Sequence, residues 1–358
     1  SPGQPAVLIG VESDDVGIHD RRCRWHRGVG GLGDQERPAI RPGFAGGAEP
    51  IPRVTRDFDA ADISDQPFGW NLPNWLLRRE ILARLNDLPN VDFRPGVGFA
   101  AMLTRTSQAR VTLTDGSRIS AKLVIGADGR NSPVREALNI GVKTTRYGQK
   151  ALAFTVSHPT PHENISTEIH RTGGPFTMVP LPDVDGKPAS AIVWMERAAE
   201  AERLRTVDVD AFEAAMNERS CQLLGPLKLT SVRNIWPIIS QYAERMSGER
   251  TALIAEAAHV MPPIGAQGLN MSLGDLSCLL ELAKAAPEAL GSQDMLDKYH
   301  RARHGEIRAR LAGVDLLNRA SMAHAQPLRD LRAAGLNTIH GLKPLRKTLM
   351  QLGLGMKA

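Results

Sequence analysis

The stretch HVMPPIGAQGLNMSLGDL, residues 259–276, decides the fold of this chain. Two prolines, Pro262 and Pro263, stiffen the backbone, because the proline ring fixes one of the two backbone angles. Gly265 and Gly268 remove side chains, so a flat ligand can reach the backbone there. A plain strand-to-helix turn is the alternative, but the combination of prolines, glycines and an asparagine favours a ligand-binding loop.

The loop joins a strand to a helix. The residues before it, TALIAEAAH, predict a short buried strand that ends near Ile254, with Glu256 just beyond its carboxyl end. After it, a helix is expected to begin near Gln267. The free N–H groups and the positive dipole end of that helix point back at the loop and favour negative charge on a planar cofactor. Apolar residues continue along one face of the helix: Leu269, Leu273, Leu276 and Leu280.

A second motif lies earlier in the chain, in KLVIGADGRNSPVREAL, residues 122–138. A buried strand is expected to end just before Asp128, and Asp128 with Gly129 makes a tight turn. Ser132 can cap a helix whose first residue is Pro133. The Asp128 carboxylate then stands where it can meet ligand hydroxyls or water bound to a pyrophosphate. A single Asp-Gly turn is common, so this motif gains weight from its occurrence together with the first.

Composition excludes several classes of protein. With 42% hydrophobic and 23% charged residues among 358, the chain is long enough for one large domain or two packed ones, and wholesale disorder is not expected. Cys23, Cys221 and Cys278 lie far apart, so neither a disulfide framework nor a metal site is predicted. The net charge of +5 is spread out and predicts no nucleic-acid partner. No spanning helix and no signal peptide are visible, so a cytoplasmic location is expected.

These two motifs in this order resemble the class A flavoprotein monooxygenases, which share the para-hydroxybenzoate hydroxylase fold. The resemblance covers about residues 55–358 and is closest to the bacterial ubiquinone-biosynthesis hydroxylases. Four stretches carry it: FGWNLPNWLLRREILARL, GPFTMVPLPD, HVMPPIGAQGLNMSL and PLRDLRAAGL. It implies FAD as cofactor, NAD(P)H as reductant, and O2 and a polyprenylated phenol as substrates.

The fold class that follows is α/β with an α+β insertion. Residues 150–196 contain several strand-like stretches separated by Pro, Gly and Asp turns, which predicts an antiparallel sheet. We expect five segments: an aberrant or poorly ordered segment at 1–50, the first part of a Rossmann-like FAD-binding domain at 51–145, a β-rich substrate domain at 146–245, the return of the FAD-binding domain at 246–285, and C-terminal helices at 286–358.

The resemblance also implies cofactor-binding residues. Glu256 stands where the family usually has an Asp that binds the ribityl chain, because AEAAH replaces the usual GDAAH. Trp75 occupies the position of a family arginine that reaches the cofactor, and Arg78 or Arg79 is expected to substitute for it. Asp128 and Gly129 are placed near the pyrophosphate and the nicotinamide route. The isoalloxazine ring is expected to contact Pro263, Gly265, Ala266, Gly268, Leu269 and Asn270.

A substrate pocket is expected between the sheet at 150–196 and the loop at 262–268, with apolar walls that exclude water. Met178, Pro180 and Trp194 are candidates for its lining, and a plain core position is the alternative for each. No side chain is assigned a catalytic role, since the flavin performs the chemistry. The locally basic C-terminal tail is either a solvated helix face or a contact with a membrane surface, at the inner face of the membrane or within a ubiquinone-biosynthesis complex.

The N-terminal region of the sequence departs from the family pattern. Members of the family begin with a strand, a GxGxxG turn and a helix that bind the adenosine half of FAD. GVGGLG at residues 28–33 is rejected as that turn, because no apolar strand is expected before it and no helix after it. Residues around 20–50 are hypothesised to be a shifted reading frame. Two alternative functions remain open: a non-catalytic remnant that does not retain FAD, and a flavin-dependent dehydrogenase or halogenase on the same fold.

Overall fold

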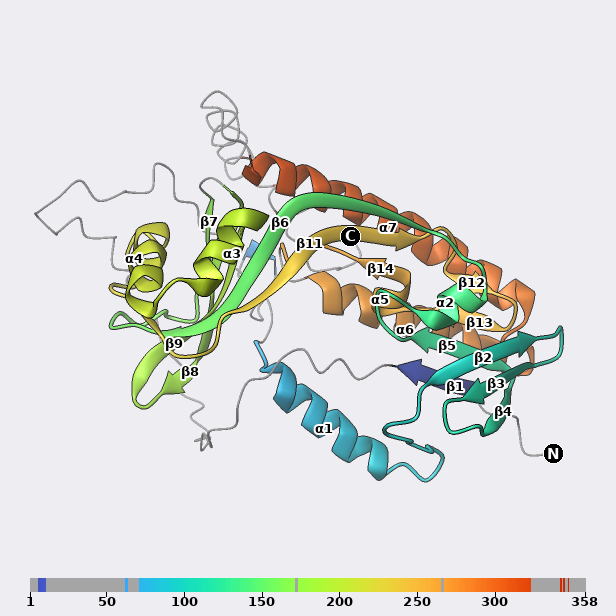
Figure 1. Cartoon of the computed structure of the whole chain (residues 1–358). Coiled ribbons are helices and arrows are strands. Elements are labelled where there is room, and N and C mark those ends of the chain that lie inside the picture. The colour runs from blue at the N-terminus through green and yellow to red at the C-terminus, as the bar shows by residue number, and fades with distance from the viewer. Residues whose placement is uncertain are drawn as a thin grey trace, which may run out of the picture.

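The computed structural model shows a parallel and an antiparallel sheet joined by two long strands, with one long helix lying along both (Figure 1). This mixed α/β architecture with an antiparallel insertion confirms the predicted fold class. The described residues are 6–10, 62–63, 71–170, 173–264 and 267–322, together with Leu342, Pro344 and Lys347. The proposed frame shift at 20–50, Gly265, Ala266 and most of the C-terminal tail lie outside them.

The parallel sheet provides the edge on which the candidate site is built. Its strand order is β1-β5-β13-β12, formed by Ala6–Gly10, Leu123–Ala127, Thr251–Leu253 and Ser247–Gly248, and only β12 runs antiparallel. Gly10 pairs with Ala127, and Leu253 pairs with Gly126. The carboxyl ends of three parallel strands therefore meet at one edge, which is where ligands bind in open α/β sheets.

Strand β1 lies within residues 1–50, where the sequence pattern predicts no regular element. Its sequence, Ala-Val-Leu-Ile-Gly, is a continuous apolar run of the kind that parallel strands carry, because both faces of a parallel sheet are covered. The run is only five residues long, too short to show a period. The segment 1–50 thus contributes one strand to the core sheet, while residues 11–50 lie outside the described part of the chain.

The antiparallel sheet has the order β14-β11-β6-β9-β8-β7. Its strands are β6 (Val142–Ser157), β7 (Thr167–His170), β8 (Pro175–Val184), β9 (Lys187–Arg197), β11 (Asn234–Ala243) and β14 (His259–Val260), with β10 (Lys228–Leu229) pairing to β6. β6 and β11 are the long strands that reach toward the parallel sheet. Since β6 begins at Val142, it crosses the domain boundary expected at 145/146.

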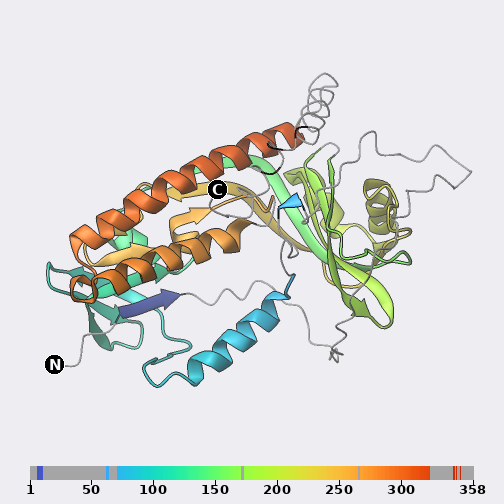
Figure 2. The ribbon, with the colours of Figure 1, turned by 180° about the vertical axis from the view of Figure 1, so that it is seen from behind.

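Helices cover these sheets. α3 (Ala198–Thr206) and α4 (Val209–Arg219) pack on the antiparallel sheet. α6 (Gln267–Ala285) and α7 (Gln293–Met322) run side by side, as Figure 2 shows from behind. The remaining elements are α1 (Asn74–Asn86), α2 (Pro133–Ala137), α5 (Ala255–Ala258), a 3-10 turn at Pro287–Ala289, and a small sheet of β2 (Phe99–Thr104), β3 (Ala109–Leu113) and β4 (Arg118–Ala121).

Three local features of the structure differ from what their sequences suggest. Residues 91–96, VDFRPG, form no strand, because Pro95 and Gly96 turn the chain there and Gly96 takes a positive φ. Asn74 does not cap α1: it is the first helical residue, and Pro73 precedes it without a side-chain cap. Helix α3 was missed, because its alanine- and charge-rich sequence gave no clear apolar period.

Two further expectations can be compared with the described residues. No helix among them is long and apolar enough to cross a membrane. No group of three or more metal-ligating side chains occurs in the described ranges either. Burial raises the pKa of the Cys278 thiol.

A histidine pair on α7 links stability to pH. The rings of His300 and His304 lie 4.7 Å apart, and burial lowers the pKa of both. His304 further contacts Tyr242 on β11, and the nearby charges of Arg245 and Arg308 oppose protonation. A lowered pKa in the folded state means that the unfolded chain binds more protons as the pH falls below about 6.5.

We therefore expect the free energy of unfolding to fall between about pH 7 and pH 5, with a smaller fall after the double substitution His300→Gln and His304→Gln. Urea denaturation at several pH values measures this. His170→Gln is the control, because His170 is a partly exposed residue that pairs with Glu168. An unchanged pH slope in the double variant would contradict the expectation.

Candidate functional site

Two strand ends bring the two sequence motifs together. Asp128 follows β5 and Glu256 follows β13, and these strands are parallel neighbours. The link is made by Arg130, whose Nε lies 3.4 Å from Glu256 Oε2. Both side chains of this pair are partly exposed. A carboxylate and a guanidinium therefore stand together at the ligand edge of the sheet, in a position to bind hydroxyl and phosphate groups.

Asp128 itself is buried and turns inward. Its Oδ1 accepts a hydrogen bond from the Ser132 hydroxyl at 2.6 Å, and its Oδ2 accepts one from the Val134 N–H at 3.0 Å. Ser132 caps α2 through the Arg135 N–H, and Pro133 occupies the first helical position, as expected. The geometry supports a structural role for Asp128 in fixing the turn, and its expected contact with the cofactor stays a prediction. Gly129 beside it has φ +82° and open space at its Cα.

Arg135 connects the Asp128–Gly129 turn to the segment that contains Glu256. Its Nη1 donates a 2.9 Å hydrogen bond to the carbonyl of Ala257 in α5. Burial lowers the pKa of Arg135, and the charges of Glu136 and Asp128 oppose that shift. The two motifs, more than a hundred residues apart in the sequence, are thus joined by one buried contact and one exposed ion pair.

The proline-rich loop before α6 offers an exposed surface with few side chains. Pro263, Gly268, Leu269 and Asn270 are all exposed, and a Cβ at Gly268 would meet nothing within 4 Å. Ile264 is buried and anchors the loop to the antiparallel sheet. α6 begins at Gln267, as the sequence predicted, so its free N–H groups lie beside this surface. A planar group with negative charge fits this surface.

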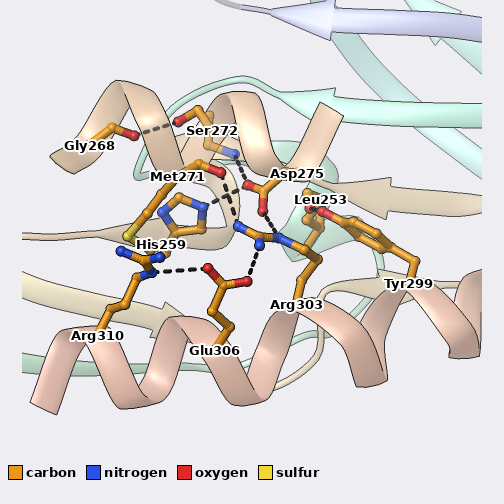
Figure 3. Close-up of polar contacts among 11 residues, drawn as sticks. Leu253, His259, Gly268, Met271, Ser272, Asp275, Tyr299, Arg303, Glu306 and Arg310 are labelled. Carbon is orange, nitrogen blue, oxygen red and sulfur yellow. Dashed lines mark hydrogen bonds and ion pairs between the residues drawn. The ribbon is translucent and has the colours of Figure 1, made fainter. Parts of the chain in front are cut away.

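Behind the loop lies a buried charged cluster, centred on Asp275 of α6 (Figure 3). Asp275 Oδ2 lies 2.7 Å from His259 Nε2, and its Oδ1 accepts a 2.9 Å hydrogen bond from Arg303 Nε on α7. Asp275 has no exposed surface, and His259 is 3% exposed. Arg303 also pairs with Glu306 and donates to the carbonyl of Met271. His259 is therefore a structural residue that is enclosed behind the loop.

Ala255, the second residue after the end of β13 and the first of α5, has a left-handed backbone. Its φ is +52°, a region that residues with a Cβ occupy at a cost of about 1–2 kcal/mol. Its N–H donates to Asp275 Oδ2 at 3.1 Å. The sequence stretch AEAAH thus places an alanine where the backbone suits glycine.

Arg79 is not brought to this edge by any contact in the described residues. It bonds to Glu80 on its own helix and lies over the Trp75 ring at 5.4 Å. α1 contributes no buried residue. The expected contact between Arg79 and the cofactor therefore stays a prediction.

The expected pocket residues lie on the far side of the antiparallel sheet. Met178 and Trp194 are buried with Phe212 and Met216, beneath α4. Pro180 is buried too, and it lies two residues after Met178 on β8, so both side chains point to the same face of the sheet. Because successive side chains in a strand point to opposite faces, these three point away from the loop that contains Ile264. Of the two alternatives in the sequence analysis, the structure supports the plain core position.

The opposite face of the same strands meets the loop. Ala151 and Met195 pair across β6 and β9, and they pack with Ile238, Ile264 and Val314. Half-buried Val193 and Trp236 extend this apolar surface. We call these seven residues the loop-facing surface. Both faces of β9 carry apolar residues, so the sequence alone does not show which face meets the loop.

Other residues of the site were also missed. Arg130 directly follows the Asp-Gly turn, and its charge beside that motif was a usable signal. Asp275 is an acidic residue within the apolar helix α6, where a buried charge needs a partner. That partner, Arg303, lies on a different helix, and no sequence spacing could have paired the two.

Comparison with known proteins gives a consistent family. Residues 56–312 match the family described as FAD binding domain. Ubiquinone hydroxylase UbiL of Rhodospirillum rubrum is 32% identical over 292 residues, which cover 81% of this chain and 67% of that protein. The mitochondrial ubiquinone biosynthesis monooxygenase COQ6 of Homo sapiens is 31% identical over 277 residues, which cover 67% of this chain and 58% of that protein.

A solved structure supports the fold. p-Nitrophenol 4-monooxygenase PnpA from Pseudomonas putida superposes with a TM-score of 0.65 at 18% identity, covering 80% of this chain and 73% of that one. At this identity the likeness shows the fold alone. The chain spans only 58% of the length of the human relative and 67% of the bacterial one.

The two faces of the antiparallel sheet can be distinguished by stability. Trp194→Ala, which empties a position that is 4% exposed, is expected to cost about 3–5 kcal/mol of unfolding free energy. Trp236→Ala, on the half-buried opposite face, is expected to cost clearly less, since it leaves a smaller cavity. Urea denaturation of both variants measures the difference, and equal losses would contradict the assignment of faces.

Proposed function

Because the chain belongs to the FAD-binding domain family, we propose that it is an FAD-dependent monooxygenase that hydroxylates a phenol in ubiquinone biosynthesis. Both relatives described above carry ubiquinone names, one a hydroxylase and one a monooxygenase. O2 is the oxidant and NAD(P)H the reductant, so that one oxygen atom enters the ring and the other leaves as water. A polyprenylated phenol is the proposed substrate, with the membrane surface or a biosynthetic complex as its source.

The observation that carries the proposal is the exposed Glu256–Arg130 pair beside the open loop at the start of α6. The pair suits the hydroxyls and phosphates of a dinucleotide. The loop suits a flat ring, since Gly268 has open space at its Cα. Charge and shape thus fit the two ends of the flavin half of FAD.

Bound FAD would supply the transfer of electrons and oxygen, and the residues of this chain would position the reacting groups. Glu256 would accept hydrogen bonds from ribityl hydroxyls. The N–H groups at the start of α6 would stabilise negative charge on the ring. Pro263 would keep the loop stiff, and Ile264 would fix its distance from the antiparallel sheet.

The loop-facing surface is the proposed seat of the substrate. Val193 and Trp236 are half-buried there, next to the Ile264 anchor of the loop. An apolar surface of this kind suits an aromatic ring with a hydrocarbon tail and excludes water from the reaction. The proposal moves the substrate from Met178 and Trp194 to the opposite face of the same strands.

A visible absorption spectrum of the purified chain, taken after mixing with FAD and gel filtration, tests the function first. Flavin bands that elute with the protein are expected, followed by phenol-dependent oxidation of NADPH. A colourless protein would contradict the proposal and would favour the alternative, a remnant that does not retain FAD.

Glu256→Gln is expected to weaken FAD binding by about tenfold, because an amide keeps the shape of the side chain but loses the charge-assisted hydrogen bonds. Flavin fluorescence titration measures the dissociation constant. Glu249→Gln is the matched control, an exposed glutamate just before β13. Equal effects of the two substitutions would remove Glu256 from the site.

Val193→Phe is expected to leave less room for a substrate on the loop-facing surface, because the phenylalanine side chain is larger. It should raise the KM for a prenylated phenol several-fold more than the KM for a small phenol, since only the larger substrate needs the whole surface. FAD binding should be unchanged. Steady-state kinetics with the two substrates checks this, and a uniform change in both KM values would contradict the placement of the substrate.

A further inference from the structure

We infer that Asp275 is a positioning residue that sets the direction of Glu256 by holding Ala255 in its left-handed conformation. The role of Glu256 toward FAD rests on the proposed function above. The control of the turn by Asp275 does not depend on it, because it concerns only contacts within the chain.

The first step is the turn itself. Ile254 is extended, with φ −133°, and Ala255 then reverses to φ +52°. This reversal ends β13 and sends Glu256 to the exposed edge, where it meets Arg130 at 3.4 Å. If Ala255 returned to a negative φ, the direction of the next side chain would change. The position of the Glu256 carboxylate therefore depends on one unfavourable backbone angle.

The second step is the contact that stabilises this angle. The Ala255 N–H donates to Asp275 Oδ2 at 3.1 Å, and the acceptor is a fully buried carboxylate. Hydrogen bonds to charged acceptors are roughly twice as strong as neutral ones. Loss of the contact would leave a partly buried N–H without this acceptor, so the left-handed conformation and the hydrogen bond support each other.

The third step is what keeps Asp275 in place. A buried carboxylate is tolerated only with strong partners, and Arg303 and His259 supply them at 2.9 and 2.7 Å. Arg303 belongs to α7, and its other donors reach Met271 and Glu306. Figure 3 shows the carboxylate held between these groups. Helix α7, which forms no part of the ligand edge, thus fixes a residue at that edge through Asp275.

A double-substitution cycle tests the inference, with Asp275→Asn and Ala255→Gly made singly and together. Asparagine has one acceptor oxygen, which cannot serve both Arg303 and the Ala255 N–H. Glycine adopts a positive φ without help from a neighbour. We expect Ala255→Gly alone to raise the urea midpoint. The drop in midpoint caused by Asp275→Asn should be about twofold larger in the wild-type background than in the Ala255→Gly background.

The same four proteins are then titrated with FAD. Asp275→Asn is expected to weaken FAD binding about tenfold, and the added Ala255→Gly should restore most of that loss, because the turn no longer needs the carboxylate. A purely structural role for Asp275 would lower stability without any rescue of FAD affinity by glycine. Equal losses in both backgrounds, in urea and in FAD affinity, would overturn the inference.

Asn318→Ala is the matched control. It removes another buried side-chain hydrogen bond of α7, the 2.9 Å contact with Gln149 Oε1, and lies fifteen residues after Arg303 along that helix. Its effect on stability should be the same in both backgrounds. A chain that binds no FAD in any form would end the proposed function, while the urea cycle, measured without FAD, would still decide the inference.

Hydrogen exchange covers the case in which both Asp275→Asn proteins fail to fold. In the wild-type chain, the amide of Ala255 should exchange as slowly as the core strands if the buried carboxylate fixes the turn. Exchange as fast as that of an exposed loop would overturn the inference.

Discussion

The buried carboxylate of Asp275 is the constraint on which the site depends. It receives a backbone N–H from the end of β13, a histidine from β14 and an arginine from α7, while it belongs itself to α6. Taking such a charge out of water costs several kcal/mol unless its partners are complete. The strand end, the loop and both helices must therefore keep fixed relative positions. This also fixes the residues at the exposed edge of the parallel sheet.

The second constraint is the parallel pairing of β5 with β13. Parallel strands end at the same edge, so Asp128 and Glu256 become neighbours although 127 residues separate them in the sequence. The two acidic residues then take different roles. Asp128 turns inward and accepts hydrogen bonds from Ser132 and Val134, whereas Glu256 stays at the surface with Arg130. Because only the outward residue has exposed charge, the proposed ribityl contact belongs to Glu256.

The two faces of the antiparallel sheet have different roles, because alternate residues of each strand point to opposite faces. One face, with Trp194 and Met178, packs beneath α3 and α4 and forms a core of its own. The other face, with Met195 and Ala151, meets Ile264 of the loop and Val314 of α7. The same strands can therefore hold the domain together on one side and present an apolar surface to a substrate on the other.

The sequence by itself determined the elements whose signals are local. The proline- and glycine-rich loop, the start of α6 at Gln267, the end of β5 and the Ser132 cap with Pro133 all follow from backbone preferences of a few residues. The sequence also indicated the flavoprotein family. Only the tertiary structure decided which face of β9 meets the loop, that Arg303 neutralises Asp275, and that Ala255 adopts a left-handed turn. These features depend on contacts between distant segments, and a residue's own sequence neighbourhood does not specify which partner will lie across from it.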